Sequence, residues 1–399
     1  MAFVPLFLYQ NLDFVLSNNV ESFVCSRCGN KNPKYIGHKN GQPYCRFCIS
    51  MCGESAKPYI PKGGLTVLDL KYKLSKEQDE IANQVLENYK NGIDTLINAV
   101  CGAGKTELVY RVIAYALSVR KTVGFAIPRR DVVIELFPRL KSAFPSNSVT
   151  MVYGGNTNHL TADIVLLTTH QLYRYENFFD LLIVDEIDAF PFKGNILLNK
   201  MFKRSLRGHF VLMSATPSES VLNYFQKPGR SLLELNTRFH HKPLPVPTVK
   251  IRPGISKIPY LIKKLKEFVS EKKPTFVFVP TIEACEDIFK IISKFVPNGQ
   301  VVHSKHPNRE KIIADFKNGI YMYLVTTAVL ERGVTIKNLQ AIIYEADHKL
   351  YDEYSLIQIS GRVGRKFDAP EGEVIFIATK ETSAIINAIK TIRKRNTYL

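Results

Sequence analysis

Short apolar runs alternate with amphipathic stretches along most of the chain, and this alternation is the clearest pattern in the sequence. Near-continuous apolar runs rich in Val, Ile, Leu and Phe are typical of parallel strands covered on both faces. One block of runs lies at residues 95–100, 122–127, 148–153, 163–168, 180–184 and 210–214, and another at 275–279, 300–303, 322–326, 341–344 and 373–378. The pattern predicts an α/β fold with two tandem parallel sheets and crossover helices.

Two proline-rich stretches separate these blocks from each other and from the N-terminal part of the chain. Residues 57–64 read Lys-Pro-Tyr-Ile-Pro-Lys-Gly-Gly, and residues 240–247 read His-His-Lys-Pro-Leu-Pro-Val-Pro. Alternating prolines disfavour helices and central strands, so both stretches are predicted to be linkers. We therefore expect an N-terminal segment at 1–20, a cysteine-containing module at 21–60, a first α/β domain at 61–240 and a second at 241–399.

Composition narrows the class of protein. The 399-residue chain carries 54 Lys and Arg against 36 Asp and Glu, a formal net charge of +18, and 45% of its residues are hydrophobic. These values exclude a wholly disordered chain and indicate a polyanionic partner, either nucleic acid or an acidic membrane surface. No apolar run reaches about 18 residues, and no basic residue precedes the apolar residues 3–8, so we expect a cytosolic protein.

A phosphate-binding loop follows the first predicted strand. Residues 99–106 read Ala-Val-Cys-Gly-Ala-Gly-Lys-Thr, and a helix is predicted at 107–118. Gly102 and Gly104 allow a tight loop whose backbone N–H groups point at phosphate oxygens. Lys105 would reach the β- and γ-phosphates of ATP, and the Thr106 hydroxyl would ligate Mg²⁺. Ala99 stands where this motif usually has its first glycine.

An acidic cluster ends a later predicted strand. Residues 181–188 read Leu-Leu-Ile-Val-Asp-Glu-Ile-Asp, and α/β sheets place their sites at the carboxyl ends of strands. Asp185 would hold Mg²⁺ through water, and Glu186 would orient or deprotonate the attacking water. Ser-Ala-Thr-Pro at 214–217 ends the last strand of the first block, and we expect it to contact Asp188.

Two further elements complete the predicted nucleotide site. Gln78 precedes the phosphate loop by the length of a helix, and its amide could pair with the adenine edge; a solvent-facing glutamine is the alternative. Residues 358–365 read Gln-Ile-Ser-Gly-Arg-Val-Gly-Arg. Arg362 and Arg365 would stabilise charge on the γ-phosphate as arginine fingers do, and a surface basic patch is the alternative.

These motifs, in this order, resemble those of superfamily 2 helicases and translocases over about residues 70–380. The resemblance implies two RecA-like domains that sandwich ATP and track a single nucleic-acid strand. It assigns contacts with that strand to Arg129, Arg130, Gly154, Thr168, Thr169, Thr326 and Thr327. Ordinary loop charges remain the alternative for the two arginines.

Five of the seven cysteines lie between residues 25 and 52. Two Cys-x-x-Cys pairs, Cys25 with Cys28 and Cys45 with Cys48, are separated by sixteen residues. Paired knuckles at this spacing converge four thiolates on Zn²⁺, and an all-sulfur set favours a structural role. Cys52 is an extra thiol that could replace one ligand. The basic and aromatic residues around the knuckles could bind nucleic acid or form an ordinary solvated surface.

A four-cysteine module ahead of a small helicase core resembles the ComFA family, the competence ATPases of naturally transformable bacteria. The resemblance implies an ATP-driven motor on single-stranded DNA at the inner face of a membrane DNA-import channel, with a small companion competence protein. A primosomal replication-restart or repair helicase is one alternative, although that family carries its cysteines within the second helicase domain. A nucleic-acid-binding scaffold with a vestigial nucleotide site is the other. The sequence does not give the direction of travel or the oligomeric state.

Overall fold

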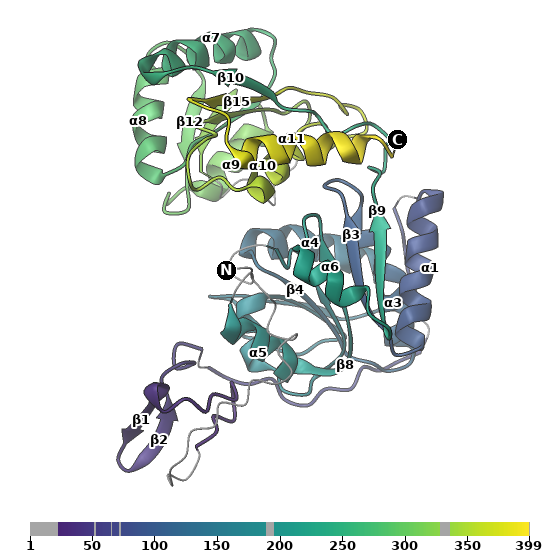
Figure 1. The fold of residues 1–399 in the computed structure, drawn as a ribbon. Helices are drawn as coiled ribbons and strands as arrows, with labels where there is room; N and C mark the ends of the chain where they lie inside the picture. Colours follow the sequence, from purple (N-terminus) through teal and green to yellow (C-terminus); the bar gives the residue numbers. More distant parts are fainter. Residues whose placement is uncertain are drawn as a thin grey trace. The chain divides into compact units, whose positions relative to one another are not determined.

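The computed structural model describes residues 23–51, 53–64, 66–71, 73–188, 195–327 and 336–398. The chain divides into two compact units, one ending at Leu235 and one beginning at Asn236, with the short loop Val100–Ala103 grouped with the second unit. Each unit is built on its own parallel sheet, as the hydrophobic pattern predicts (Figure 1). Within these ranges, no helix is long and apolar enough to cross a membrane.

A small hairpin precedes the first parallel sheet. The 3₁₀ helix η2 (Pro33–Tyr35) leads into the antiparallel strands β1 (Ile36–Lys39) and β2 (Gln42–Cys45). Asn40 and Gly41 join the strands with φ angles of 50° and 74°, the left-handed pair that two-residue hairpin turns favour. The hydrophobic pattern does not reveal these strands, because half of their residues are exposed and they carry no apolar run.

The first unit holds a sheet of seven parallel strands in the spatial order β5-β6-β4-β7-β8-β3-β9. In chain order the strands are β3 (Asp94–Ala99), β4 (Val123–Ile127), β5 (Val149–Val152), β6 (Ile164–Thr168), β7 (Phe179–Val184), β8 (Leu206–Ser214) and β9 (Arg230–Leu235). Six of them coincide with predicted strands. The seventh, β9, lies at the edge of the sheet with only its last residue buried, so it lacks the signal of a central strand.

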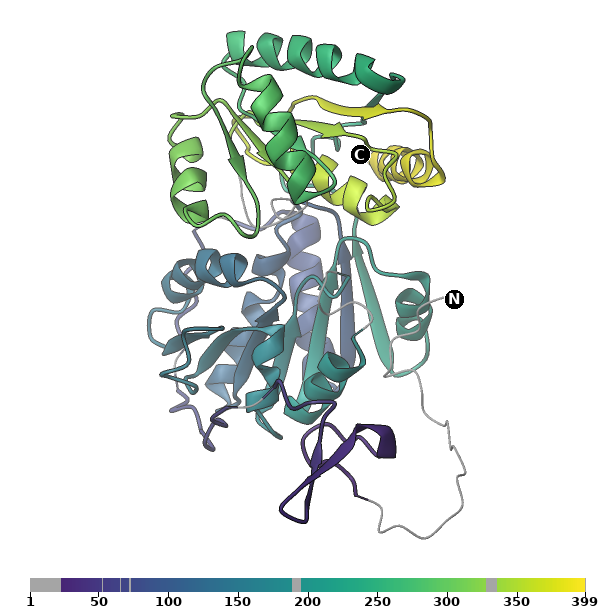
Figure 2. The ribbon, with the colours of Figure 1, turned by 90° about the vertical axis from the view of Figure 1, so that its left-hand side faces the viewer.

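Helices cover both faces of this sheet (Figures 1 and 2). They are α1 (Lys76–Lys90), α2 (Lys105–Leu108), α3 (Tyr110–Ser118), α4 (Arg130–Ala143), the 3₁₀ helix η3 (Thr169–Arg174), α5 (Ile196–Ser205) and α6 (Glu219–Phe225). Right-handed crossovers place α3 and α4 on one face, and the crossovers that run back across the sheet place η3, α5 and α6 on the other. On that second face Leu172, Met201 and Phe225 share an apolar core with Leu182 of β7.

One predicted helix is divided into two. The helix expected at 107–118 begins earlier, at Lys105, and is interrupted at Val109, which separates α2 from α3. The Val109 N–H group bonds to the carbonyl of Thr106 at 3.4 Å, a tighter turn than that of an α-helix. The apolar pattern alone does not predict this break, because buried residues continue on both sides of it.

The second unit repeats the parallel architecture with six strands in the order β10-β15-β14-β11-β13-β12. The strands are β10 (Thr248–Ile251), β11 (Thr275–Phe278), β12 (Gly299–Val302), β13 (Tyr323–Thr326), β14 (Gln340–Tyr344) and β15 (Val374–Ala378). The helices are η4 (Gly254–Ser256), α7 (Lys257–Ser270), α8 (Ile282–Ile292), α9 (Arg309–Lys317), α10 (Glu353–Ser360) and α11 (Ser383–Asn396). Strand β10 is additional to the predicted set, because it is a half-exposed edge strand.

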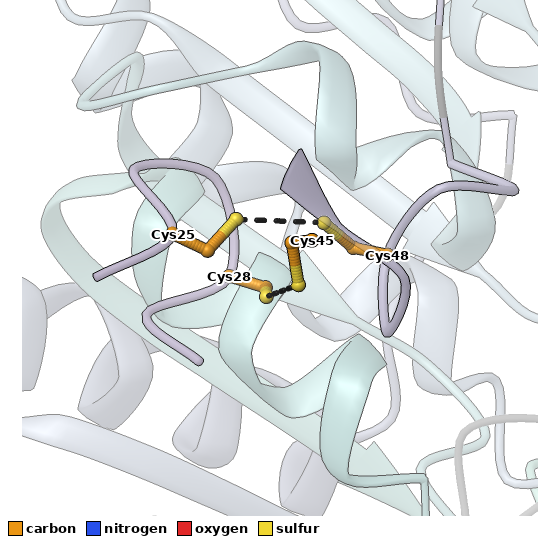
Figure 3. A group of neighbouring side chains, drawn as sticks. All are labelled: Cys25, Cys28, Cys45 and Cys48. Atoms are coloured by element: carbon orange, nitrogen blue, oxygen red, sulfur yellow. Dashed lines mark hydrogen bonds between the residues drawn. The ribbon is translucent and has the colours of Figure 1, made fainter. Parts of the chain in front are cut away.

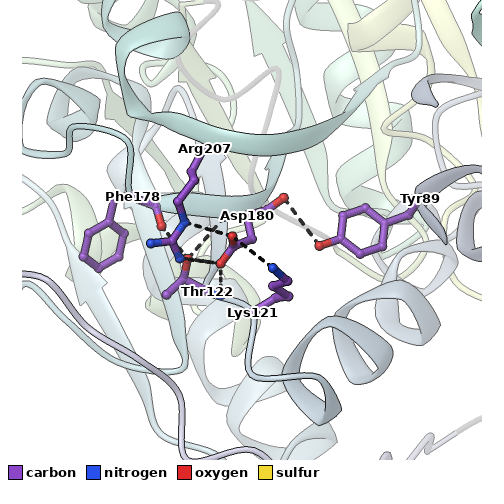
Figure 4. Close-up of polar contacts among 6 residues, drawn as sticks. All are labelled: Tyr89, Lys121, Thr122, Phe178, Asp180 and Arg207. Atoms are coloured by element: carbon purple, nitrogen blue, oxygen red, sulfur yellow. Dashed lines mark hydrogen bonds and ion pairs between the residues drawn. The ribbon is translucent and has the colours of Figure 1, made fainter. Parts of the chain in front are cut away.

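A buried carboxylate ties together the amino-terminal edge of the first sheet (Figure 4). The Asp180 carboxylate accepts hydrogen bonds from Arg207 Nε at 2.9 Å and Nη2 at 2.5 Å, and from the Thr122 backbone N–H at 2.8 Å. Burial opposes ionisation of Asp180, but the bonds from Arg207 and Thr122 outweigh it and hold the pKa of the carboxyl below its ordinary value. The Asp180 carboxylate therefore links β7, on which it lies, to Arg207 of β8 and to Thr122 at the start of β4.

Replacing Asp180 with asparagine is expected to destabilise the protein by about 1–3 kcal/mol at pH 7. The figure is lower than for a fully buried pair because 46% of the Arg207 side chain is exposed to solvent. The depressed pKa makes this contribution complete above the unfolded pKa of about 4 and removes it as the pH falls further. Urea unfolding should therefore separate the two proteins most at pH 7 and by a smaller margin at pH 3.5, with the difference lost only as the pH falls through the depressed folded-state pKa of Asp180.

The matched control for this measurement is Asp287→Asn, in a pair whose Asp287 and Lys290 side chains are each 72% exposed. Its unfolding should match that of the wild-type protein at both pH values. Equal stability of Asp180→Asn and wild type at pH 7 would contradict the role assigned to the buried carboxylate.

Candidate nucleotide and nucleic-acid site

The carboxyl ends of the first sheet's strands lie along one edge, because all seven strands are parallel. The strands β7, β8 and β3 are neighbours in this sheet, and β5, β6 and β4 are neighbours beside them. Within this sheet, the phosphate loop and the acidic residues predicted to bind nucleotide follow β3 and β7. The residues of the first unit that are predicted to contact nucleic acid lie at or just after the ends of β4, β5 and β6. The two predicted sets therefore occupy adjoining halves of one edge, which we call the nucleotide half and the nucleic-acid half.

The phosphate loop follows β3 in the nucleotide half. Gly102 and Gly104 have φ angles of 85° and 73°, a left-handed conformation that side chains rarely adopt. Helix α2 begins directly after the loop at Lys105, whose Nζ donates a hydrogen bond to the carbonyl of Ala99 at 3.3 Å. The loop thus has the backbone conformation that a phosphate cradle requires, and its lysine folds back over the loop.

Gln78 lies beside this loop and is 6% exposed, so the alternative of a solvent-facing glutamine is wrong. Its Oε1 accepts a hydrogen bond from the Ser75 N–H at 2.9 Å, and the Ser75 hydroxyl accepts one from the Gln78 N–H, which forms a capping box at the start of α1. A Cβ atom on Gly104 would lie 2.6 Å from Gln78 Nε2. The cap therefore fixes the glutamine amide against the phosphate loop and explains why this position has no side chain.

The two acidic residues of the nucleotide half follow β7. Burial raises the pKa of Asp185 to about 6, and the Lys105 ammonium opposes that shift. The Asp185 Oδ1 atom accepts a hydrogen bond from the Glu186 N–H at 2.8 Å. Glu186 has a φ angle of 58°, a left-handed conformation that costs about 1–3 kcal/mol in a non-glycine residue. A divalent cation would favour ionised Asp185, so this environment fits Mg²⁺ accompanying a bound phosphate.

Asp188 connects the acidic loop to the end of β8. Its carboxylate accepts hydrogen bonds from the Ser214 hydroxyl at 2.7 Å and from the Thr216 hydroxyl at 2.6 Å. The Ser214 hydroxyl also accepts a bond from the Thr216 N–H at 3.0 Å. The predicted contact between Ser-Ala-Thr and Asp188 is confirmed, and it joins the loops after β7 and β8.

The nucleic-acid half presents both exposed and buried residues. Arg130 is exposed, with its guanidinium 5.0 Å from the centre of the Tyr153 ring, and the neighbouring Gly154 is also exposed. Arg129 is half-buried at the start of α4. Thr168 and Thr169 are 7% and 0% exposed at the end of β6. Without rearrangement, these two threonines can therefore present backbone groups to a ligand, but not their side chains.

In the second unit, Thr326 is buried at the end of β13, and its hydroxyl donates a hydrogen bond to the carbonyl of Thr327 at 3.2 Å. Residues 328–334 of the same motif lie outside the described residues. The arginine motif begins in α10, and Gly361, Arg362 and Arg365 follow the helix. Arg362 is 2% exposed, so the alternative of a surface basic patch is wrong for this residue.

The four cysteines converge on one point (Figure 3). The Sγ atoms of Cys25 and Cys48 lie 3.6 Å apart, as do those of Cys28 and Cys45, and all four sulfurs lie within 4.8 Å of one another. A tetrahedral ion with Zn–S bonds of about 2.3 Å separates its sulfurs by about 3.8 Å. The arrangement therefore fits a metal ion with four thiolate ligands. Cys52 lies outside the described residues.

The surroundings of the thiols also favour a cation. Burial raises the pKa of Cys28 to about 11, so this thiol disfavours the ionised form when no cation is near. At Cys25, by contrast, burial is outweighed by hydrogen bonds from the backbone N–H groups of Cys28 and Arg27, which lower the pKa of that thiol to about 7. A bound dication reverses the preference of Cys28, because thiolates are its ligands. The hairpin β1–β2 supplies Cys45 as its last residue, which explains why this end of the module needs the turn at Asn40 and Gly41.

Residues 53–64, which include the predicted linker at 57–64, have no helix or strand, yet hydrogen bonds hold them to other parts of the first unit. Arg174, 9% exposed, donates from Nη1 to the carbonyl of Glu54 at 2.7 Å, and its own carbonyl accepts a bond from the Ala56 N–H at 2.9 Å. The Tyr59 hydroxyl donates to Asp163 at 2.9 Å. Composition predicts the absence of regular structure here but not these contacts, because they depend on residues more than 100 positions away.

Two protein-family profiles match the chain. Residues 71–219 match the type III restriction enzyme, res subunit family, and residues 256–367 match the helicase conserved C-terminal domain family. These matches identify a superfamily 2 helicase core with two RecA-like domains, and they show that the chain is an ATP hydrolase. These matches do not favour the alternative of a scaffold with a vestigial nucleotide site.

Curated relatives match over nearly the whole chain. Competence protein ComFA of Bacillus subtilis (strain 168) is 33% identical over 96% of this chain and 87% of its own length. Competence protein ComFA of Streptococcus pneumoniae (strain ATCC BAA-255 / R6) is 32% identical over 93% of this chain and 90% of its own. Among solved structures, S. cerevisiae Dbp5 bound to RNA and ADP BeF3 has a TM-score of 0.64 at 18% identity, covering 82% of this chain and 88% of that chain. This last similarity supports the fold.

Proposed function

Because the chain belongs to the ComFA family of competence proteins, we propose that it is an ATP-driven motor that moves along single-stranded DNA during DNA uptake. One observation of the structure carries the proposal. The nucleotide half and the nucleic-acid half adjoin on one sheet edge, so a change at the acidic loop after β7 is one strand away from the loop after β4. The family match favours this function over the replication-restart alternative.

The nucleotide half supplies the residues for hydrolysis. The loop at Gly102 and Gly104 would cradle the phosphates with backbone N–H groups, and Lys105 would neutralise the β- and γ-phosphates. Thr106 and Asp185 would hold Mg²⁺, which offsets the phosphate charge when it is bound. Glu186 would orient and deprotonate the attacking water.

The second unit would contribute charge stabilisation. Arg362 and Arg365 carry guanidinium groups in a glycine-containing loop that the fold holds in a defined conformation. In the proposed mechanism they approach the γ-phosphate when the protein closes around ATP. The Asp188 bonds to Ser214 and Thr216 would transmit the state of the nucleotide along the edge towards the bound strand.

The metal of the four-cysteine module would be Zn²⁺, since four thiolates in a tetrahedron suit this ion and no position is open for catalysis. The partners proposed for the full protein are single-stranded DNA, a membrane DNA-import channel and a small companion competence protein. Their support is the family membership and the surplus of eighteen positive charges. In this proposal the protein works at the inner face of the membrane.

The comparison of ATP hydrolysis with three nucleic acids tests the proposal. We expect single-stranded DNA to raise kcat by about tenfold or more, and duplex DNA and RNA of equal length to raise it less. Lys105→Ala protein provides the background rate. Equal rates with and without single-stranded DNA would contradict the proposed function, and strong unwinding of a forked duplex would favour the replication-restart alternative.

A further inference from the structure

A buried arginine lies in the segment that joins β9 to β10. Arg238 is 2% exposed, and no carboxylate of the described residues pairs with its guanidinium. Burying a cation without an anion is costly, and apolar residues of similar volume usually serve stability as well or better. The position of this arginine therefore calls for a reason other than packing.

Both terminal nitrogens of the Arg238 guanidinium, Nη1 and Nη2, bond to one loop. Arg238 Nη1 donates to the carbonyls of Val363 at 3.0 Å and Gly364 at 2.8 Å, and Nη2 donates to the carbonyl of Gly361 at 3.3 Å. His240, two residues further along, places Nε2 2.9 Å from the same Gly364 carbonyl. All three acceptors belong to the segment that carries Arg362 and Arg365.

The loop has a conformation that needs such support. Gly364 has a φ angle of 67°, and a Cβ atom at this position would lie 2.2 Å from the carbonyl oxygen of Pro370. This conformation turns the carbonyls of residues 363 and 364 towards Arg238. A planar guanidinium satisfies several converging carbonyls at once, which a lysine ammonium on a flexible stem does less well.

Arg238 and Arg365 also share an acceptor. Arg365 Nε donates to the carbonyl of Gly361 at 2.9 Å, the same oxygen that Arg238 Nη2 contacts. Burial and the nearby charge of Arg365 lower the pKa of Arg238 to about 10, so the guanidinium stays protonated at neutral pH. Both guanidinium groups therefore donate to the Gly361 carbonyl. We expect displacement of the Arg238 guanidinium to change the position of the Arg365 guanidinium through this shared oxygen.

We propose that Arg238 is a positioning residue for hydrolysis, one that fixes the loop from Gly361 to Arg365 so that the Arg365 guanidinium is held ready for the γ-phosphate. The inference rests on the proposed role of Arg365. It adds Arg238, which lies in none of the sequence motifs, to the residues proposed to act in hydrolysis. Arg238 itself does not touch the nucleotide in this mechanism; it acts through the shared carbonyl and through Val363 and Gly364.

The test is a double-mutant cycle on steady-state ATP hydrolysis with single-stranded DNA. Arg238→Gln should lower kcat by about 10- to 100-fold, the effect of misplacing a catalytic group by about 1 Å. Its dissociation constant for a fluorescent ATP analogue should stay within about twofold of the wild-type value, and Arg238→Lys should recover part of kcat. Arg365→Gln should lower kcat by about 10³-fold, and the double variant should be no slower than Arg365→Gln alone.

The matched control is Arg204→Gln. Arg204 also donates to two backbone carbonyls, those of Tyr173 at 3.1 Å and Tyr175 at 3.2 Å, but in the first unit. Its loss should lower the melting temperature without changing kcat at 20 °C. If Arg238→Gln does not fold, His240→Gln removes one bond to the same Gly364 carbonyl and should lower kcat by about threefold.

Wild-type kcat in folded Arg238→Gln, or in His240→Gln where that variant stands in for it, would overturn the inference. A double variant whose loss equals the product of the single losses would also overturn it, because the two arginines would then act independently. A wild-type kcat in Arg365→Gln would instead contradict the proposed role of Arg365, so failure of the premise is distinguishable from failure of the inference.

Discussion

Glu186→Gln protein is expected to bind ATP normally and to hydrolyse it about 10²- to 10⁴-fold more slowly than wild type. Glutamine keeps the size of the side chain and can adopt the same backbone conformation, but its amide cannot take a proton from water. Single-turnover hydrolysis with radiolabelled ATP measures the chemical step, and a fluorescent ATP analogue measures binding. The two measurements together separate loss of catalysis from loss of the substrate.

Lys105→Ala is the contrasting variant for this experiment. Removal of a charged donor to phosphate should weaken ATP binding by about 10- to 100-fold, whereas Glu186→Gln should leave it within about threefold of wild type. Wild-type single-turnover rates in Glu186→Gln would show that another group activates the water. Weak ATP binding in that variant would show that Glu186 serves the substrate and not the chemical step.

Cys45→Ser is expected to remove the metal and unfold the four-cysteine module while leaving basal ATP hydrolysis within about threefold of wild type. Structural Zn²⁺ contributes about 10 kcal/mol or more to a small module, so loss of one of four thiolates removes most of what holds it together. Lys105, Asp185 and Glu186 follow β3 and β7, far along the chain from the module, and the hydrogen bonds described for the four thiols join them to one another. Elemental analysis should find one zinc per wild-type chain and less than about 0.2 in the variant.

Limited proteolysis locates the effect of Cys45→Ser. Trypsin should cut the variant between residues 25 and 51, because the lysines and arginines there would lose the fixed backbone conformation of the folded module, and should leave the rest of the chain intact. Cys285→Ala is the matched control, because Cys285 is buried in the core of the second unit and the module belongs to the first. Full zinc content in Cys45→Ser, or the same loss in Cys285→Ala, would contradict the assignment of the metal ligands.

Much of the site can be predicted from the sequence because parallel sheets convert chain order into position. A motif directly after a buried apolar run must lie at the carboxyl edge, so the phosphate loop, Asp185 and Ser214 are placed as soon as their strands are recognised. The cysteine spacing is informative for a different reason. Only two residues separate the cysteines of each Cys-x-x-Cys pair, so the directions in which their sulfurs can point are restricted. The contact of Asp188 with Ser214 and Thr216 follows from neighbouring strands.

The features that escaped prediction depend on contacts between distant residues. Arg238 carries no local signal, because an arginine in a polar linker is ordinary until the loop that it holds is known. Edge strands such as β9 and β10 alternate weakly and lack the apolar run of a central strand. The buried state of Thr169 and Thr326 was equally hidden, since threonines at strand ends are usually exposed turn residues.

The central claim is that ATP hydrolysis moves the protein along a single strand. The most direct measurement uses single-stranded DNA of increasing length with a fluorophore at one end, in one series at the 5′ end and in another at the 3′ end. In one series, the delay before the protein reaches the fluorophore should grow in proportion to strand length after ATP is added, and Glu186→Gln should abolish the signal. A delay that is the same at every length in both series would contradict the account.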